Sequence, residues 1–440
     1  MDSNSMTNSV EQKARFYHET AFNARWQPPF KSNAGLTATE FGNRQEAIGF
    51  RPMNEELSHS YNALAAWCKA RDYAGYDPFD GLNSRLFQAT PFKHWRASRL
   101  AWVQFLKRCP VNLRPLLLIT PGRNAKGLAL FALARLAEFR RARQPAAEQE
   151  ARYLLDKLAA MRLEGYAGAC WGYNFSWQGR AFYAPQGTPT IVPTAFAARA
   201  FIEAADVLDE TYMKPARSVC DFILGNLRET ETGEDEVCWS YSPLDRTRVL
   251  NASLLAAETL GVVGALRGET ELQDWARRGV NYVIRRQWAD GSWPYGGDSY
   301  QGWTDNFHTA FILTSLARIR EHCGDPDGKI AESIRRGYDF WNAHFFSPDG
   351  WPKYFHDKIY PADLHSTGAA IVALLELTEF DPDAPRHAQH LANWADANMR
   401  SADGAFHYQK HANYTNKIPY MRWTQAWMMY ALARLNQVAG

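Results

Sequence analysis

Residues 287–308, QWADGSWPYGGDSYQGWTDNFH, decide the fold, because this stretch recurs in altered form along most of the chain. An amphipathic segment precedes it and ends near Asp290-Gly291, after which come an aromatic Trp-Pro-Tyr and a polar loop. The loop leads into HTAFILTSLARI, which is almost entirely apolar. A helix with one apolar stripe lies at a surface, whereas a helix that is apolar all round is buried. The stretch therefore predicts a link from an outer helix to an inner one.

The apolar helices repeat at a nearly constant period. Five of their starts align in one column with steps of 57 or 58 residues, at Pro193, Asn251, His308, His365 and Trp423. A sixth apolar helix begins at Lys126, one somewhat longer step earlier. An amphipathic helix precedes each of them, near 151–163, 211–227, 271–287, 328–346 and 384–399, with either 55–72 or 95–108 serving the first.

Six buried and six half-buried helices predict an all-α fold, a closed (α/α)6 toroid of six helical hairpins. An open solenoid is the rival arrangement, but the repeats stop at six, which is the number that closes a ring. The unbroken repeat favours a single domain over residues 51–440, although a length of 440 residues would also allow two or three. Residues 1–50 are rich in polar side chains and lack periodicity, so we expect a partly ordered extension there.

Charge and composition exclude several kinds of protein. The formal net charge is only +2 with both signs interspersed, so neither a nucleic-acid partner nor attraction to an anionic membrane surface is predicted. The six cysteines show no CxxC and no metal-ligand spacing, which indicates reduced thiols in a cytoplasmic protein. No integral membrane segment and no signal peptide are predicted, because no apolar run is long enough. No phosphate-binding loop or dinucleotide motif occurs, so no metal and no cofactor are predicted.

The predicted site lies at one end of the toroid. Links from outer to inner helices are long and the return links are short, so the long links gather at one mouth. An aromatic-x-Tyr element recurs in these long links, and rings with a polar edge suit stacking against sugars. Packing between repeats is the alternative for the repeated rings. The aromatic residues predicted to bind substrate are Trp171, Tyr173, Trp239, Tyr241, Trp293, Tyr295, Trp303, Tyr354, Tyr360 and Trp423.

Polar residues cluster where the inner helices begin. Asp305 and His308 stand three apart at one helix start, and Asp363 and His365 occupy the same place one repeat later. A turn-rich loop over 71–83 is expected to lie across the mouth. The other polar residues predicted to contact substrate are Asn306, His356, Asp357, Arg422, Asp77 and Asp80.

These residues fit two chemistries. Glycoside hydrolysis requires two carboxylates, with Asp305 as the preferred acid or base and Asp363 as its partner. Proton abstraction beside a uronic carboxylate, as in a polysaccharide lyase or a C5-epimerase, requires a His or Tyr acid–base set, for which His308, His365 and Tyr420 are candidates. For each histidine, a role in capping a helix is the alternative. If the protein is not an enzyme, the sequence favours a glycan-binding module without catalytic activity.

Two resemblances rest on short motifs. Gln287-Trp-Ala-Asp-Gly-Ser-Trp293 resembles the QxxxGxW motif of squalene-hopene cyclases, which are α/α barrels. Their DxDD proton donor is absent here, so this resemblance supports the fold and not terpene cyclisation. A longer resemblance is carried by RDYAGYDPFDGLNS, KRCPVNLRPLL, DGSWPYG, WTDNFHTAF, YFHDKIYPADLHSTGAA and KIPYMRWTQAWMMYALA.

Together these segments resemble the VpsJ-type proteins of bacterial polysaccharide and exopolysaccharide biosynthesis clusters, which belong to the six-hairpin glycosidase-like superfamily. The resemblance implies a carbohydrate substrate and association with other polysaccharide biosynthesis proteins, and it supplies no mapped catalytic residues. The resulting prediction is a carbohydrate-active protein, first of all a glycoside hydrolase. A polysaccharide lyase or epimerase is the alternative among enzymes.

Overall fold

The computed structural model describes residues 55–180 and 182–439. The predicted extension over residues 1–50 lies outside this part. No helix in the described part of the chain combines the length and apolar character that crossing a lipid bilayer requires. The six cysteines, all in the described part, form no disulfide.

Six inner helices of the described chain form a closed ring. Each is largely buried, as its continuous apolar sequence predicts. They are α6 (Ala125–Ala142), α8 (Ile191–Val207), α10 (Leu250–Arg267), α12 (Asn306–Cys323), α14 (Leu364–Glu376) and α16 (Ala426–Ala439). Each inner helix packs against the next, and α16 packs against α6. The predicted (α/α)6 toroid is confirmed, and the open solenoid is wrong.

Six outer helices surround this ring. They are α3 (Glu55–Ala70), α7 (Pro145–Ala160), α9 (Met213–Asn226), α11 (Thr270–Ile284), α13 (Lys329–His344) and α15 (Ala384–Met399). In α11, Leu272, Ala276 and Val280 recur every fourth residue and are buried, while Asp274 and Arg277 face solvent. α3 packs against α16 and α15, so the first outer helix in sequence completes the last hairpin.

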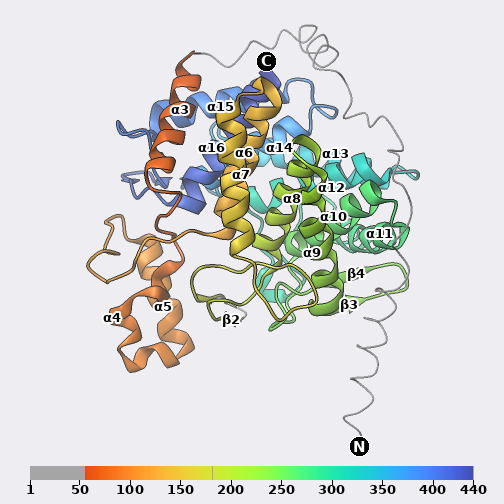
Figure 1. Ribbon diagram of the computed structural model, residues 1–440, viewed down its shortest axis with the longest axis horizontal. Helices are drawn as coiled ribbons and strands as arrows, with labels where there is room; N and C mark the ends of the chain where they lie inside the picture. The colour runs from red at the N-terminus through yellow and green to blue at the C-terminus, as the bar shows by residue number, and fades with distance from the viewer. Residues whose placement is uncertain (1–54, 181, 440) are drawn as a thin grey trace, which may run out of the picture. The chain divides into compact units, whose positions relative to one another are not determined.

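A second amphipathic segment, left open by the sequence, lies outside the ring. α4 (Arg85–Gln88) and α5 (Arg96–Arg108) form an insertion between α3 and α6, drawn in orange in Figure 1. α5 packs chiefly against two short 3-10 helices, η2 (Asp80–Asn83) and η3 (Pro91–His94), and against strand β1 (Trp177–Gln178). A small separate core holds the insertion together, consisting of Leu82, Phe87 and Val103.

The long links at the mouth carry all the strands of the described chain, each two to four residues long. β1 pairs with β2 (Tyr183–Ala184), and β3 (Glu229–Thr232) pairs with β4 (Val237–Trp239). β5 (Ala362–Asp363), β6 (Gln409–Lys410) and β7 (Thr415–Asn416) form an antiparallel sheet in that order. The last link ends in a π-helical turn, Met421–Gln425, at the start of α16.

The QxxxGxW motif ties neighbouring repeats together. The Gln287 amide donates to the carbonyl oxygens of Gly291, at 2.8 Å, and of Ser333 in α13, at 3.0 Å. Trp293 is buried, and its ring lies so close to Gly337 that an added Cβ there would be 2.3 Å from ring carbons. The motif thus fixes the link after α11 against the next outer helix.

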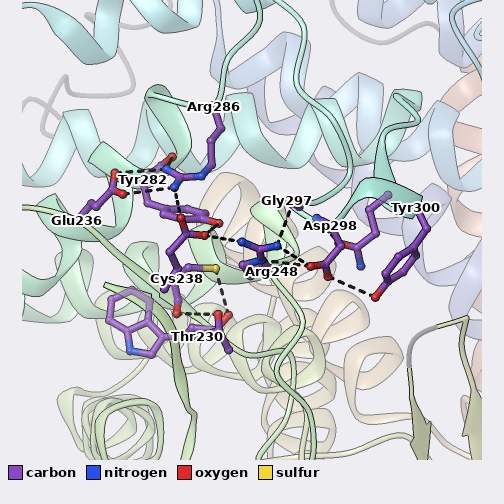
Figure 2. A network of polar contacts seen from close by, with 12 residues as sticks. Thr230, Glu236, Cys238, Arg248, Tyr282, Arg286, Gly297, Asp298 and Tyr300 are labelled. Carbon is purple, nitrogen blue, oxygen red and sulfur yellow. Dashed lines mark hydrogen bonds and ion pairs between the residues drawn. The ribbon is translucent and has the colours of Figure 1, made fainter. Parts of the chain in front are cut away.

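A polar network fixes two more of the long links (Figure 2). The Glu231 carboxylate of β3 accepts hydrogen bonds from Arg248 at 3.1 Å, from the Tyr282 hydroxyl at 3.0 Å and from Arg286 at 2.8 Å. Arg248 also pairs with Asp298 at 2.8 Å. The network joins the β3–β4 hairpin, the start of α10, the outer helix α11 and the link that precedes α12.

Buried ion pairs join the inner helices at or beyond their midpoints. Glu258 of α10 pairs with Arg199 of α8 at 2.6 Å and with Arg318 of α12 at 3.1 Å. Glu376 of α14 pairs with Arg434 of α16 at 2.8 Å. Burial alone would raise the pKa of Glu376, but Arg434 and Arg318 outweigh it and hold that pKa at about 2.

Candidate active site

Asp305 and His308 form a hydrogen-bonded pair at the start of α12. Asp305 caps the helix, because its carboxylate accepts from the backbone N–H of His308 at 3.1 Å. The same carboxylate lies 2.7 Å from Nδ1 of His308 and accepts from Nε1 of Trp303 at 3.2 Å. Nδ1 is therefore held by the carboxylate, and Nε2 is the ring nitrogen of His308 left for a substrate.

His365 occupies the same position one repeat later, but its ring has no hydrogen-bonding partner. Asp363 caps α14 through the backbone N–H groups of His365 and Ser366. The His365 side chain is 1% exposed, and neither ring nitrogen has a hydrogen bond within the described residues. Burial, together with the nearby Lys126 cation, lowers the pKa of His365 well below its ordinary value. The imidazole is thus neutral, with one donor and one acceptor unused.

Aromatic rings surround both histidines. The Phe307 ring centroid lies 4.0 Å from that of His308 and 4.5 Å from that of His365, so the two imidazoles share one phenyl neighbour. Trp423 meets His365 edge-on at 4.1 Å. Tyr295 lies 4.7 Å from His308. The two histidines therefore lie close together, although they belong to different inner helices.

Tyrosines from four links approach this centre. Tyr295 stacks on Trp303 at a centroid distance of 4.5 Å, and the hydroxyls of Tyr173 and Tyr241 are 2.8 Å apart. The Tyr354 ring lies 5.7 Å from Phe307. Burial raises the pKa of all four tyrosines, so their hydroxyls stay protonated and can donate hydrogen bonds.

Arg422 and Asp77 form a buried bidentate ion pair beside the aromatic rings. Nε and Nη2 of Arg422 lie 2.6 and 2.8 Å from the two carboxylate oxygens of Asp77. Asp80, also predicted to contact substrate, pairs with buried Arg114 at 2.7 Å, and burial raises the pKa of Asp80 to about 6. These pairs anchor the loop over 71–83 across the start of α16, and a small pocket opens beside Arg422 and Gly127.

Two lysines near the histidines were missed by the sequence reasoning. Lys126 Nζ lies 4.4 to 5.1 Å from the rings of Phe196, Phe311 and Trp427, which belong to α8, α12 and α16. Lys126 is 2% exposed, and its side-chain nitrogen forms no hydrogen bond or ion pair with the described residues. Lys107 of α5 reaches over Phe79, at 4.6 Å. A lysine opening an otherwise apolar inner helix was the available signal for Lys126.

Asp305 and Asp363, the two carboxylates of the predicted glycoside hydrolase, already accept hydrogen bonds from other residues. Asp305 accepts three hydrogen bonds at its helix cap. Asp363 is 0% exposed and accepts from Gln409 at 2.7 Å and from Trp423 at 3.3 Å in addition to its capping bonds. Burial raises the pKa of Asp363. Neither carboxylate therefore presents a free oxygen to a glycosidic bond.

Several other predicted residues pack inside the protein. Trp171 and Trp293 are buried and donate their indole N–H groups to backbone oxygens of the preceding outer helices, and Trp239 packs on Trp275. Asn306 is fully buried and donates to the Lys353 carbonyl at 2.9 Å. These four residues therefore pack in the interior and hold the links in place.

The remaining predicted residues lie at the edges of the centre. The Tyr420 hydroxyl is buried without a hydrogen bond to the described residues, and its ring lies 4.9 Å from that of Tyr408. His356 is half-buried near the Thr304 carbonyl, and Asp357 is exposed. The Tyr360 ring is tilted against that of Trp351, at a centroid distance of 5.4 Å. The described residues contain no group of three or more His, Cys, Asp or Glu side chains arranged to hold a metal ion.

Comparisons with known proteins identify the fold. No family model and no curated protein matches the sequence. Among solved structures, a cellobiose 2-epimerase from Bacillus thermoamylovorans has a TM-score of 0.57 at 12% identity, over 71% of this chain and 87% of that one.

Two sugar hydrolases share the same fold. An unsaturated glucuronyl hydrolase from Bacillus sp. GL1 has a TM-score of 0.56 at 14% identity, over 88% of this chain and 97% of that one. A GH76 alpha-mannanase from Bacteroides thetaiotaomicron has a TM-score of 0.51 at 10% identity, over 71% and 85%. At these identities the likeness is one of fold.

Proposed function

We propose that this protein is a carbohydrate-active enzyme that transfers a proton at a carbon atom of a sugar, as an epimerase or isomerase does. One observation carries the proposal: two histidines from successive inner helices meet at Phe307, one held by a carboxylate and the other neutral and unpartnered. The fold it shares with an enzyme named as a cellobiose 2-epimerase supports the same class of substrate.

The two histidines suit different parts of such a reaction. Nε2 of His308 would take the proton from the carbon next to the carbonyl of the open sugar, because Asp305 stabilises the imidazolium that forms. Neutral His365 would donate its unused N–H as a hydrogen bond to the carbonyl oxygen, and the His308 imidazolium would return its proton to the sugar, which restores both side chains. The tyrosine hydroxyls and the ring of Trp303 would hold the sugar.

This proposal moves the chemistry from carboxylates to histidines. Glycoside hydrolysis through Asp305 and Asp363 stays a prediction from the sequence, but both groups are committed to capping helices. A polysaccharide lyase would use the same histidines and would release an unsaturated product. A role in a bacterial polysaccharide pathway, with VpsJ-type proteins as relatives and other biosynthesis proteins as partners, also stays a prediction.

Deuterium exchange tests the proposal directly. The protein is incubated in D2O with cellobiose, mannobiose or glucuronate, and nuclear magnetic resonance follows deuterium at the carbon next to the anomeric centre. We expect incorporation together with an epimer or isomer. His308→Gln and His365→Gln should each reduce the rate by about a hundredfold or more. Asp305→Asn should also reduce the rate by about a hundredfold or more. The helix cap should be kept, because asparagine also caps helices.

Asp349→Asn is the matched control, because Asp349 is exposed in the link that precedes α14, outside the predicted site, and should leave the rate unchanged. New reducing ends without carbon-bound deuterium would instead support hydrolysis and contradict the proposal. A product absorbing in the ultraviolet would identify a lyase.

A further inference from the structure

The insertion between α3 and α6 carries positive charge that no carboxylate balances. The sequence contains no Asp or Glu between Asp80 and Glu138. Six basic residues lie between positions 85 and 108, and none of them forms an ion pair with a carboxylate of the described chain: Arg85, Lys93, Arg96, Arg99, Lys107 and Arg108. On the toroid, carboxylates balance many of the exposed arginines, as Asp235 and Glu236 do for Arg285. The formal net charge of +2 conceals this local excess.

The same insertion exposes large apolar side chains. Trp95 is 59% exposed and lies against the exposed ring of Phe92, at a centroid distance of 5.7 Å. The segment over residues 85–118 has seven such side chains: Leu86, Phe92, Trp95, Phe105, Val111, Leu116 and Leu118. The exposed large apolar side chains in the rest of the described chain are spread from residue 153 to residue 414, and most are tyrosines. The insertion is therefore unlike the rest of the surface.

Helix α5 shows how the two features combine. Its exposed stripe runs through Ala97, Ala101 and Phe105, which are spaced four residues apart, and arginines 96 and 108 stand at its two ends. On outer helix α11 the exposed positions are charged with both signs, as at Asp274 and Arg277. An apolar stripe flanked by unpaired cations suits an interface between water and lipid.

We infer that the insertion formed by α4, η3 and α5, with the loop that follows to residue 118, docks the protein on an anionic lipid surface. Lipid headgroups supply the negative charge that the exposed Arg85, Arg96 and Arg108 lack. The acyl region takes up exposed side chains such as Trp95 and Phe105. An acidic polysaccharide or a nucleic acid would satisfy the charges but would leave the exposed aliphatic side chains in water. The inference does not depend on the proposed reaction.

Docking would also orient the mouth of the toroid. Lys107 belongs to α5 and yet reaches the ring of Phe79, and the Phe79 ring lies 5.2 Å from Trp423 beside His365. The insertion is thus continuous with the candidate active site. A sugar chain attached to lipid, or growing at a lipid surface, would reach the site without leaving that surface.

Vesicle co-sedimentation of the full chain tests the inference. We expect binding to vesicles of phosphatidylcholine with about one third phosphatidylglycerol, little binding to phosphatidylcholine alone, and release by high salt. Trp95→Ser combined with Phe105→Ser should abolish binding. Arg85→Glu combined with Arg108→Glu should weaken it by at least about tenfold, since each basic residue contributes near the membrane surface.

Leu266→Ser combined with Arg277→Glu is the matched control, because both residues are exposed on helices α10 and α11 of the toroid. Binding that is absent, that is equal on both kinds of vesicle, or that falls equally in the control would overturn the inference. So would a change in oligomeric state of the Trp95 and Phe105 variant on analytical ultracentrifugation, because a second copy would then cover the surface. Circular dichroism checks that all variants are folded.

Discussion

Packing alone does not account for the position of Lys126 in the described chain. Its side-chain nitrogen lies on three aromatic faces and has no hydrogen-bond acceptor among the described residues. Burial, then Arg422 and Arg199, lower its pKa well below the ordinary value. A buried group of this kind costs free energy unless a ligand or water supplies its partner.

We expect Lys126→Met to separate binding from folding. Methionine fills the same space without a charge, so the thermal midpoint of unfolding should stay unchanged or rise. The KM for a turned-over sugar should rise about tenfold or more, as expected when a charge-assisted hydrogen bond is lost. Calorimetry and initial rates measure the two effects. A lower midpoint with an unchanged KM would mean that Lys126 serves packing only.

The sequence predicted where the site residues stand along the chain but not all of their roles. The positions of Asp305, His308, Asp363 and His365 at helix starts followed from the repeat. The sequence did not reveal that both carboxylates act as caps, because capping depends on backbone geometry at each start. It also did not separate Trp293, which is buried, from Trp303, which lies beside His308's carboxylate partner, because the same side chain serves packing and stacking.

At the scale of the elements, the ion pairs between inner helices should make the protein sensitive to acid. The pKa of Glu376 is about 2 in the folded protein, against an ordinary value of 4.5. Between pH 2 and 4.5, the unfolded chain therefore binds more protons than the folded protein does. Stability is fully present above pH 4.5 and is lost as the pH falls toward 2.

Glu376→Gln should lower the free energy of unfolding near neutral pH by about 3 kcal/mol, because Arg434 loses its buried partner. The free energy of unfolding of the variant should also fall less between pH 4.5 and 3 than that of the wild type. Urea denaturation between pH 3 and 7 measures both. Glu332→Gln, exposed on the outer helix α13, is the control. Parallel pH profiles for the wild type and Glu376→Gln would contradict this account.

The helices themselves were predictable from period and polarity. The alternation of apolar and amphipathic segments predicted the inner and outer helices to within a few residues at most ends, although α7 begins at Pro145, before the predicted 151. The choice between 55–72 and 95–108 stayed open because both are amphipathic. Only packing decides it: α3 rests on α16, whereas α5 covers a small core of its own.

At the scale of the whole molecule, closure of the ring should make folding depend on its last helix. α16 packs against α6, α14 and α3, so its loss would expose apolar faces on three helices. We expect a chain ending at Gln425 to lack a cooperative thermal transition, and the full chain to show one. Differential scanning calorimetry measures this. A cooperative transition in the shortened chain would mean that the remaining hairpins are stable as an open array.

The pairing of α3 with α16 has a consequence for synthesis on the ribosome. α3 is made first among the described helices, and its inner partner is made last. At roughly 5 to 20 residues per second, the apolar face of α3 waits for tens of seconds before α16 emerges. During that time it is a natural binding segment for a chaperone. Final closure is a late event between segments far apart in sequence, which is a slow kind of contact to form.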